Sequence, residues 1–205
     1  MDMLMEAVRL FHRGGFVMYP LLLCSISIVA IALERFRYYR GNALGADELT
    51  TAVSRQLKAG KWDEALQLCE QTPGAVARVL AAGLRERETA AVKEAFESAT
   101  AWEAAELRKY LGYLDLIVTM SPLLGLLGTV VGMIGSFSVF DAAGGNPAAI
   151  TGGVGEALVA TAAGLGVAIL ALTAHSYFCH RLDLLITAIE RGCAGVVAAA
   201  KDGRS

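Results

Sequence analysis

One carboxylate stands out among the residues of this 205-residue chain that could carry chemistry. Between Tyr110 and His180 there is no Lys or Arg, and only three acidic residues occur: Asp115, Asp141 and Glu156. Glu156 begins the apolar run EALVATAAGLGVAILAL, which as a helix belongs to a stretch long enough to cross a bilayer. An acidic side chain in mid-membrane costs roughly 3 kcal/mol, so such residues usually serve a cation or proton path. Glu156 therefore predicts an ion-handling membrane protein.

The depth of Glu156 leaves two interpretations open. If its helix starts near Ala149, Glu156 lies about 10 Å along the axis, at a rise of about 1.5 Å per residue. That depth is the outer third of a bilayer rather than its centre. Glu156 is then either an interfacial carboxylate that simply reaches water, or a group that loads and releases protons.

Two threonines could extend a polar path from Glu156. Thr129 lies midway along another apolar stretch, and Thr161 follows Glu156 by five residues. A Thr in a membrane helix commonly donates its hydroxyl to a carbonyl of its own helix, which is the structural alternative. The neighbouring Glu156, with no basic residue nearby in sequence, favours a hydrated path instead.

Small residues recur in the same two apolar stretches and predict close helix packing, because small side chains let membrane helices approach one another. This packing could occur within one chain, between identical subunits around an axis, or in both places. At spacings of three or four residues, the first stretch holds Ser121, Gly125, Gly128, Gly132 and Gly135. The second holds Gly152, Ala160, Gly164 and Ala168 in a row of four-residue steps that also includes Glu156.

These patterns predict an all-α integral membrane protein with three transmembrane helices and long cytoplasmic helical extensions. The long helix that leads into the second span is expected to continue into the membrane without a break. The segments are an interfacial amphipathic helix at 1–15, spans at 16–34, 113–140 and 149–178, a cytoplasmic helical domain at 35–112, an outer loop at 141–148 and a cytoplasmic C-terminal helix at 179–205.

The orientation follows from the basic residues. The segments after the first span, before the second and after the third hold 16 of the 18 Lys and Arg residues. The positive-inside rule places these segments in the cytoplasm and the N-terminus in the periplasm. Glu34, Arg35 and Asp115 then lie near the inner interface, where long charged side chains can reach the headgroups.

Several function classes lack support in the sequence. No basic stripe with interleaved aromatic residues indicates nucleic-acid binding. The cysteines and histidines do not follow a metal-ligand spacing, and no nucleophile–base set or phosphate-binding loop occurs. We therefore expect no metal, no cofactor other than the proton as coupling ion, and no enzymatic activity.

The motifs SPLLGLLGTVVGMIGSF and GEALVATAAGLGVAILALTAHSYF together resemble the MotA/TolQ/ExbB proton-channel family, and most closely its ExbB and TolQ branch. The resemblance implies a homopentamer in the lipid of a bacterial inner membrane, with spans two and three lining a central pore. It implies a single-span partner like ExbD or TolR in that pore, and a TonB- or TolA-like protein that the motor energises. The family's polar positions fall on Thr129, Glu156 and Thr161.

The chain departs from the family pattern in the third span. Leu170 stands where the family often has Pro, Gly155 stands where Ser is common, and His175–Ser176 replaces a usual Asn.

The second hypothesis, from another class of function, is a non-conducting oligomeric scaffold that anchors partner proteins. The small-residue packing fits both hypotheses, whereas Glu156 favours the motor.

Overall fold

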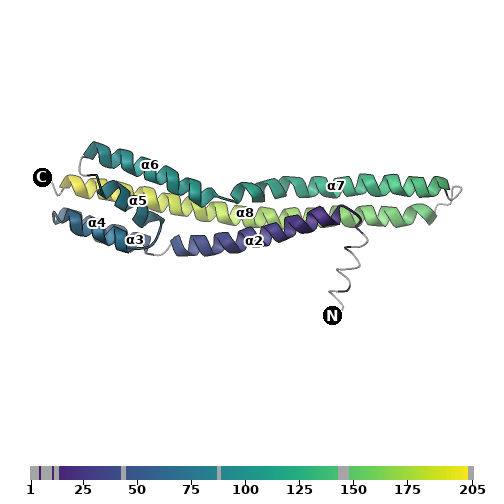
Figure 1. The fold of residues 1–205 in the computed structure, drawn as a ribbon, viewed down its shortest axis with the longest axis horizontal. Coiled ribbons are helices and arrows are strands. Elements are labelled where there is room, and N and C mark those ends of the chain that lie inside the picture. Colours follow the sequence, from purple (N-terminus) through teal and green to yellow (C-terminus); the bar gives the residue numbers. More distant parts are fainter. Residues whose placement is uncertain are drawn as a thin grey trace. The chain divides into compact units, whose positions relative to one another are not determined.

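The computed structural model describes residues 5, 11, 14–42, 45–86, 89–142 and 148–202, and no β-strand occurs among them. Figure 1 shows the helical architecture, which confirms the predicted all-α fold class. The helices are α2 (Met18–Asn42), α3 (Ala46–Lys58), α4 (Trp62–Gln71), α5 (Ala75–Leu84), α6 (Thr89–Arg108), α7 (Leu111–Ala142) and α8 (Ala148–Asp202). The predicted interfacial helix at 1–15 and the outer loop at 141–148 fall largely outside the described residues.

Helices α2, α7 and α8 each contain a stretch long and apolar enough to cross a membrane. They have 25, 32 and 55 residues, and a span needs about 20. Pro20 lies in the first turn of α2, where a missing N–H leaves no hydrogen bond unmade. The three apolar helices of a multi-pass membrane protein are thus confirmed, and the exact limits of the spans stay predictions.

Two expectations about where helices end were wrong. The helix that precedes the second span does not continue into it, because α6 ends at Arg108 and α7 begins at Leu111. Tyr110 has a φ of 67°, in the left-handed region that interrupts a right-handed helix. At the other end of the chain, the third span and the C-terminal amphipathic helix are one continuous helix, α8.

The chain divides into two compact units, and the first consists of Met1–Ala32 and Tyr110–Ser176. It contains all of α7, the early part of α2 and the first part of α8. Its buried positions are mostly small or sit where helices meet, whereas large apolar side chains such as Leu123 and Ile169 point outward. This inversion is expected of helices whose solvent is lipid, since lipid tails are as apolar as leucine.

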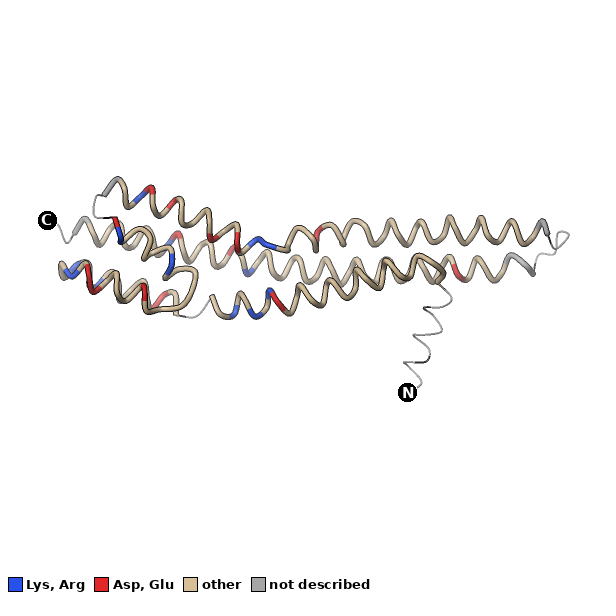
Figure 2. Tube along the Cα trace, viewed as in Figure 1, with Lys and Arg blue, Asp and Glu red and all other residues tan. Residues whose placement is uncertain are grey.

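The second unit consists of Leu33–Lys109 and Tyr177–Ser205. Here α3 is amphipathic and buries Leu49, Val53 and Leu57 at helical spacing, while α5 is buried along nearly its whole length. Figure 2 shows acidic and basic residues along α3 to α6. The unit therefore follows the apolar-inside, charged-outside pattern of a water-exposed helical domain.

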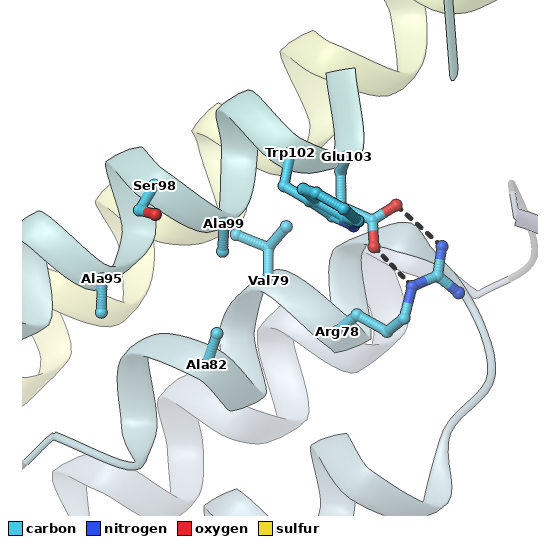
Figure 3. A pocket seen from close by; sticks show the side chains of 8 residues that line it. All are labelled: Arg78, Val79, Ala82, Ala95, Ser98, Ala99, Trp102 and Glu103. Atoms are coloured by element: carbon cyan, nitrogen blue, oxygen red, sulfur yellow. Dashed lines mark hydrogen bonds and ion pairs between the residues drawn. The ribbon is translucent and has the colours of Figure 1, made fainter. Parts of the chain in front are cut away.

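A surface hollow of about 530 Å³ lies between α5 and α6 in the second unit (Figure 3). Trp102 lines it and is 74% exposed, while Glu103 beside it is buried. Arg78 pairs with Glu103 through Nε and Nη2, and Nη2 also donates to Asn42 Oδ1 at 2.9 Å. The hydrogen bonds that Arg78 donates to the Glu103 carboxylate raise the pKa of Arg78 above its usual value, so the pair stays charged and joins α5 to α6.

Candidate functional site

Glu156 lies near the start of α8, and its side chain is half-buried. Its carboxyl group lies against the backbone of Gly15, just before α2 begins. A Cβ atom added to Gly15 would lie 3.2 Å from the carboxyl carbon of Glu156. The next turn of α8 faces α7, because Ala157 and Ala160 are buried there. The helices thus bring the carboxyl to the point where the start of α2 meets α8.

The two threonines differ in what they bind. Thr161 Oγ1 donates to the carbonyl oxygen of Gly125 on α7 at 3.1 Å, so its hydroxyl joins two helices. Thr129 Oγ1 donates to Leu126 O of its own helix at 2.6 Å. Thr129 therefore follows the structural alternative of a back-bonded threonine, and Thr161 does not. Among the hydrogen bonds of the described residues, none joins either threonine to Glu156.

Small residues bring α7 and α8 together in the first unit, where the two helices run side by side (Figure 1). A Cβ atom on Gly125 would lie 3.1 Å from Thr161 Cα, and one on Gly128 would lie 2.5 Å from Ala160 Cβ. A Cβ atom on Gly164 would lie 2.6 Å from the carbonyl oxygen of Ser121. These approaches allow no added methyl group without separating the helices.

The remaining small residues of the two predicted rows differ in how closely they approach other atoms. A Cβ atom on Gly132 would lie 3.1 Å from Gly153 O, whereas added Cβ atoms on Gly135 and Gly152 would meet no atom within 4 Å. Ala168 is buried, further along α8. Gly135 and Gly152 therefore do not take part in the close approach of α7 to α8.

Ser121 is a buried polar residue that sequence reasoning treated only as a small packing residue. Its side chain is 0% exposed, and among the described residues its hydroxyl has no hydrogen-bond partner. It lies on α7 directly before Pro122 and faces the backbone of Gly164. A buried hydroxyl without a partner costs free energy, so Ser121 contributes closeness of packing rather than a bond.

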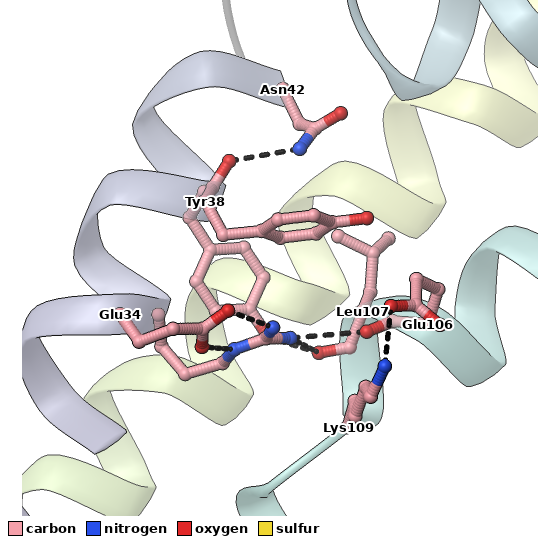
Figure 4. Close-up of polar contacts among 8 residues, drawn as sticks. Glu34, Tyr38, Asn42, Glu106, Leu107 and Lys109 are labelled. Carbon is pink, nitrogen blue, oxygen red and sulfur yellow. Dashed lines mark hydrogen bonds and ion pairs between the residues drawn. The ribbon is translucent and has the colours of Figure 1, made fainter. Parts of the chain in front are cut away.

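Arg35, at the inner end of the first apolar stretch, is 1% exposed. Its Nη2 donates to Glu34 Oε1 at 2.6 Å, and its Nη1 donates to Glu106 O at 3.0 Å and to Leu107 O at 3.4 Å. The guanidinium also lies 4.6 Å from the centroid of the Tyr38 ring. Figure 4 shows this cluster, in which α2 caps the last carbonyls of α6.

Tyr39, also on α2, binds a carbonyl at the same end of α6. The hydroxyl of Tyr39 donates to Leu107 O at 2.7 Å, and the ring stacks on Phe178 at a centroid distance of 5.7 Å. Burial raises the pKa of Tyr39 to about 12, so this hydroxyl keeps its proton at neutral pH. Of the other residues predicted at the inner interface, Glu34 is partly exposed beside Arg35, and Asp115 is exposed in the first turns of α7.

The structure does not gather the predicted residues into one catalytic centre. Glu156 and Thr161 lie on α8, while Thr129 lies on α7, and each has separate neighbours. Within the described residues, no group of three His, Cys, Asp or Glu side chains could hold a metal ion.

Sequence reasoning missed Gly15 and Tyr39. The Gly14–Gly15 pair before the first span was a visible turn signal, but its closeness to Glu156 depends on how α2 and α8 pack. Tyr39 gave no signal beyond an aromatic residue near a membrane interface. Both contacts join segments far apart in the chain, which periodicity along one segment does not reveal.

Comparison with known proteins agrees with these features. Residues 71–191 match the MotA/TolQ/ExbB proton channel family. The chain is 31% identical over 188 residues to a putative biopolymer transport protein ExbB homolog of Methanothermobacter thermautotrophicus, a match that covers 89% of this chain and 66% of the relative. It is 37% identical over 171 residues to the putative biopolymer transport protein ExbB-like 1 of a Synechocystis species, covering 79% of this chain and 66% of that protein.

A third relative is a TolQ protein rather than an ExbB protein. The Tol-Pal system protein TolQ of Pseudomonas aeruginosa is 36% identical over 96 residues, which is 46% of this chain and 42% of TolQ. The matches to the two ExbB-like relatives each cover 66% of the relative, so the chain spans just under two thirds of their length. The family match covers α5, α6 and α7 and most of α8, including Glu156 and both threonines. The chain is therefore a member of the MotA/TolQ/ExbB proton channel family, and it is similar to ExbB-like proteins over most of its length.

Proposed function

We propose that this protein is the pore-forming subunit of a proton-driven motor in a bacterial inner membrane. The observation that carries the proposal is Glu156, a carboxylate on an apolar membrane helix in a stretch of chain without Lys or Arg. Ionisable residues inside a membrane usually mark an ion or proton path. Membership of a proton channel family supports the same role.

In this proposal five copies surround a pore lined by α7 and α8. Glu156 loads and releases the proton, and Thr129 and Thr161 are polar steps beside it. Outward-facing apolar side chains of the first unit, together with Gly135 and Gly152, contact lipid or the next copy. The N-terminus lies in the periplasm, and 35–112 and 179–205 form the cytoplasmic helical part.

The proposed partners complete the motor. A single-span protein like ExbD or TolR lies in the pore and carries a membrane Asp, and a TonB- or TolA-like protein receives the motion. The names of the relatives, biopolymer transport and the Tol-Pal system, support these two kinds of task. Energetically, one proton crossing about 100 mV releases about 2.3 kcal/mol.

The test is purification of the full chain from its native membranes in mild detergent, followed by mass spectrometry of the intact complex. The proposal predicts a pentamer that holds a small single-span protein with a membrane Asp. The Glu156→Gln variant should form the same complex, because the substitution keeps size and removes only the charge. A stable oligomer that holds no such partner would contradict the motor and support the non-conducting scaffold.

A further inference from the structure

We propose that Gly15 is a positioning residue for Glu156. The bare backbone of Gly15 leaves a seat, free of any side chain, in which the Glu156 carboxyl rests beside the first turn of α2. For its effect on proton movement the inference rests on the proposed function, whereas the contact itself is independent of that function.

The conformation of Gly15 suits glycine. Its φ is 67°, in the left-handed region, where other L-residues are disfavoured by contact between Cβ and the backbone. Its carbonyl oxygen accepts the N–H of Met18 at 3.2 Å, which ties this conformation to the start of α2. The turn that begins the helix therefore already favours glycine at this position.

The contact with Glu156 adds a second requirement. A Cβ atom at Gly15 would overlap Oε1 of Glu156, and it would lie 3.7 Å from Glu156 Cγ. Any side chain there must push the carboxyl aside or move the turn. The neighbouring Gly14 differs, because the three atoms nearest to a Cβ atom on it would all belong to the flexible side chain of Met18.

The turn is held in place, so it cannot easily move away from the carboxyl. Val17, two residues on, is buried, and its Cβ would lie 3.6 Å from a Cβ atom on Gly128 of α7. On the other side, the rings of Phe11 and Tyr19 meet edge to face, with centroids 5.3 Å apart. Because both flanks are packed, the strain of an added methyl group falls on the Glu156 side chain.

Gly15 thus fixes the position of the Glu156 carboxyl. In the proposed function, α2 then contributes to the proton site, although α7 and α8 line the path.

Labelling with a hydrophobic carbodiimide tests the contact in the full chain in native membranes. The reagent modifies protonated carboxyl groups, and mass spectrometry of the Glu156 peptide gives the initial rate. We expect Gly15→Ala to react severalfold faster than the parent, because the carboxyl leaves its seat. Gly14→Ala is the matched control and should react like the parent. Equal labelling rates in Gly15→Ala and Gly14→Ala would overturn the inference.

Proton flux in the same variants tests the consequence. Displacing a reacting group by about 1 Å can cost about 100-fold in rate, so we expect Gly15→Ala to lower flux at least about tenfold. Glu156→Asp combined with Gly15→Ala should recover part of that loss, because the shorter side chain leaves room for the methyl group. An additive loss in the double variant would contradict a shared contact.

Gly15→Asn separates the steric effect from backbone strain, since Asn tolerates a left-handed conformation. It should keep the turn and still displace Glu156, and labelling like that of the parent would count against the inference. If neither Gly15→Ala nor Gly15→Asn accumulates in the membrane, the double variant Gly15→Asn with Glu156→Ala should accumulate, because the carboxyl that the added side chain would meet has been removed. Failure of this double variant to accumulate would overturn the contact. Normal flux in Glu156→Gln would instead refute the proposed function and leave the labelling result standing.

Discussion

Arg35 illustrates at the residue scale how a buried charge is accommodated beside a membrane. Its guanidinium bonds a carboxylate and two main-chain carbonyls and lies over an aromatic ring. The planar fork of an arginine can serve several acceptors at once, whereas a lysine ammonium is a compact point charge. The residue therefore determines how the end of α2 meets the end of α6.

We predict that Arg35→Lys lowers the free energy of unfolding by about 2 kcal/mol, because hydrogen bonds from a charged donor to buried carbonyls are lost. The measurement is the thermal midpoint of the purified protein in detergent. Arg37→Lys, two residues on and exposed, is the control and should leave the midpoint unchanged. Equal midpoints in the two variants would show that the cap contributes nothing measurable.

Cys69 on α4 makes the second unit sensitive to alkali. Burial raises the pKa of its thiol from 9.0 to about 12. Because the folded pKa is the higher one, the contribution of the thiol to stability is complete below about pH 9 and is lost as the pH rises from about 9 towards 12. Between about pH 8 and about pH 10.5 this loss amounts to about 2 kcal/mol.

We therefore expect the thermal midpoint to fall over that pH range, and to fall less steeply in Cys69→Ala. The comparison that matters is the slope of the midpoint against pH, since the substitution also changes packing at every pH. Parallel slopes in the parent and the variant would mean that Cys69 ionises as freely in the folded chain as in the unfolded one.

At the scale of elements, the approach of α7 to α8 depends on particular glycines. A methyl group on Gly164 would meet backbone atoms of Ser121 and Gly125, which cannot rotate away as a side chain could. Overpacking of this kind typically costs about 1–3 kcal/mol. Gly166, two residues on in the same helix, faces open space within 4 Å.

We predict that Gly164→Ala destabilises the protein by about 1–3 kcal/mol. Gly166→Ala should be neutral or stabilising by up to about 1 kcal/mol, because alanine is the better helix former. Thermal unfolding in detergent compares the two. If Gly164→Ala is as stable as Gly166→Ala, α7 and α8 do not pack through Gly164.

The elements also show what the sequence could and could not predict. Hydropathy was enough to predict the three apolar helices, because a long run of apolar residues directly indicates a helix surrounded by lipid. The break at Tyr110 was missed, since neither Gly nor Pro marks it and a left-handed φ at a tyrosine has no sequence signal. The unbroken α8 was missed for the opposite reason, because the change from apolar to amphipathic residues suggested an end where the backbone has none.

The site was predictable to the same limited degree. Glu156 could be selected from composition alone, because a carboxylate in an apolar run is rare. The different bonds of Thr129 and Thr161 could not, since they depend on which carbonyl lies opposite each hydroxyl. Gly15 became visible only when the start of α2 was placed beside α8.

At the scale of the whole molecule, the two units differ in the kind of surface that they present. The first unit presents large apolar side chains outward and keeps small residues between its helices, as suits lipid and neighbouring copies. The second unit has amphipathic helices with charged surfaces, as suits water. The motor hypothesis places the proton path in the first unit, at Glu156.

The central claim is that protons pass through the assembled protein by way of Glu156, and proton uptake into liposomes tests it most directly. The complex purified with its native partners is reconstituted, a membrane potential is imposed, and the internal pH is followed for the parent and for Glu156→Gln. We predict uptake in the parent and a rate in Glu156→Gln equal to that of protein-free liposomes, with the same oligomer by mass spectrometry. Uptake at the parental rate in an intact Glu156→Gln complex would contradict the account.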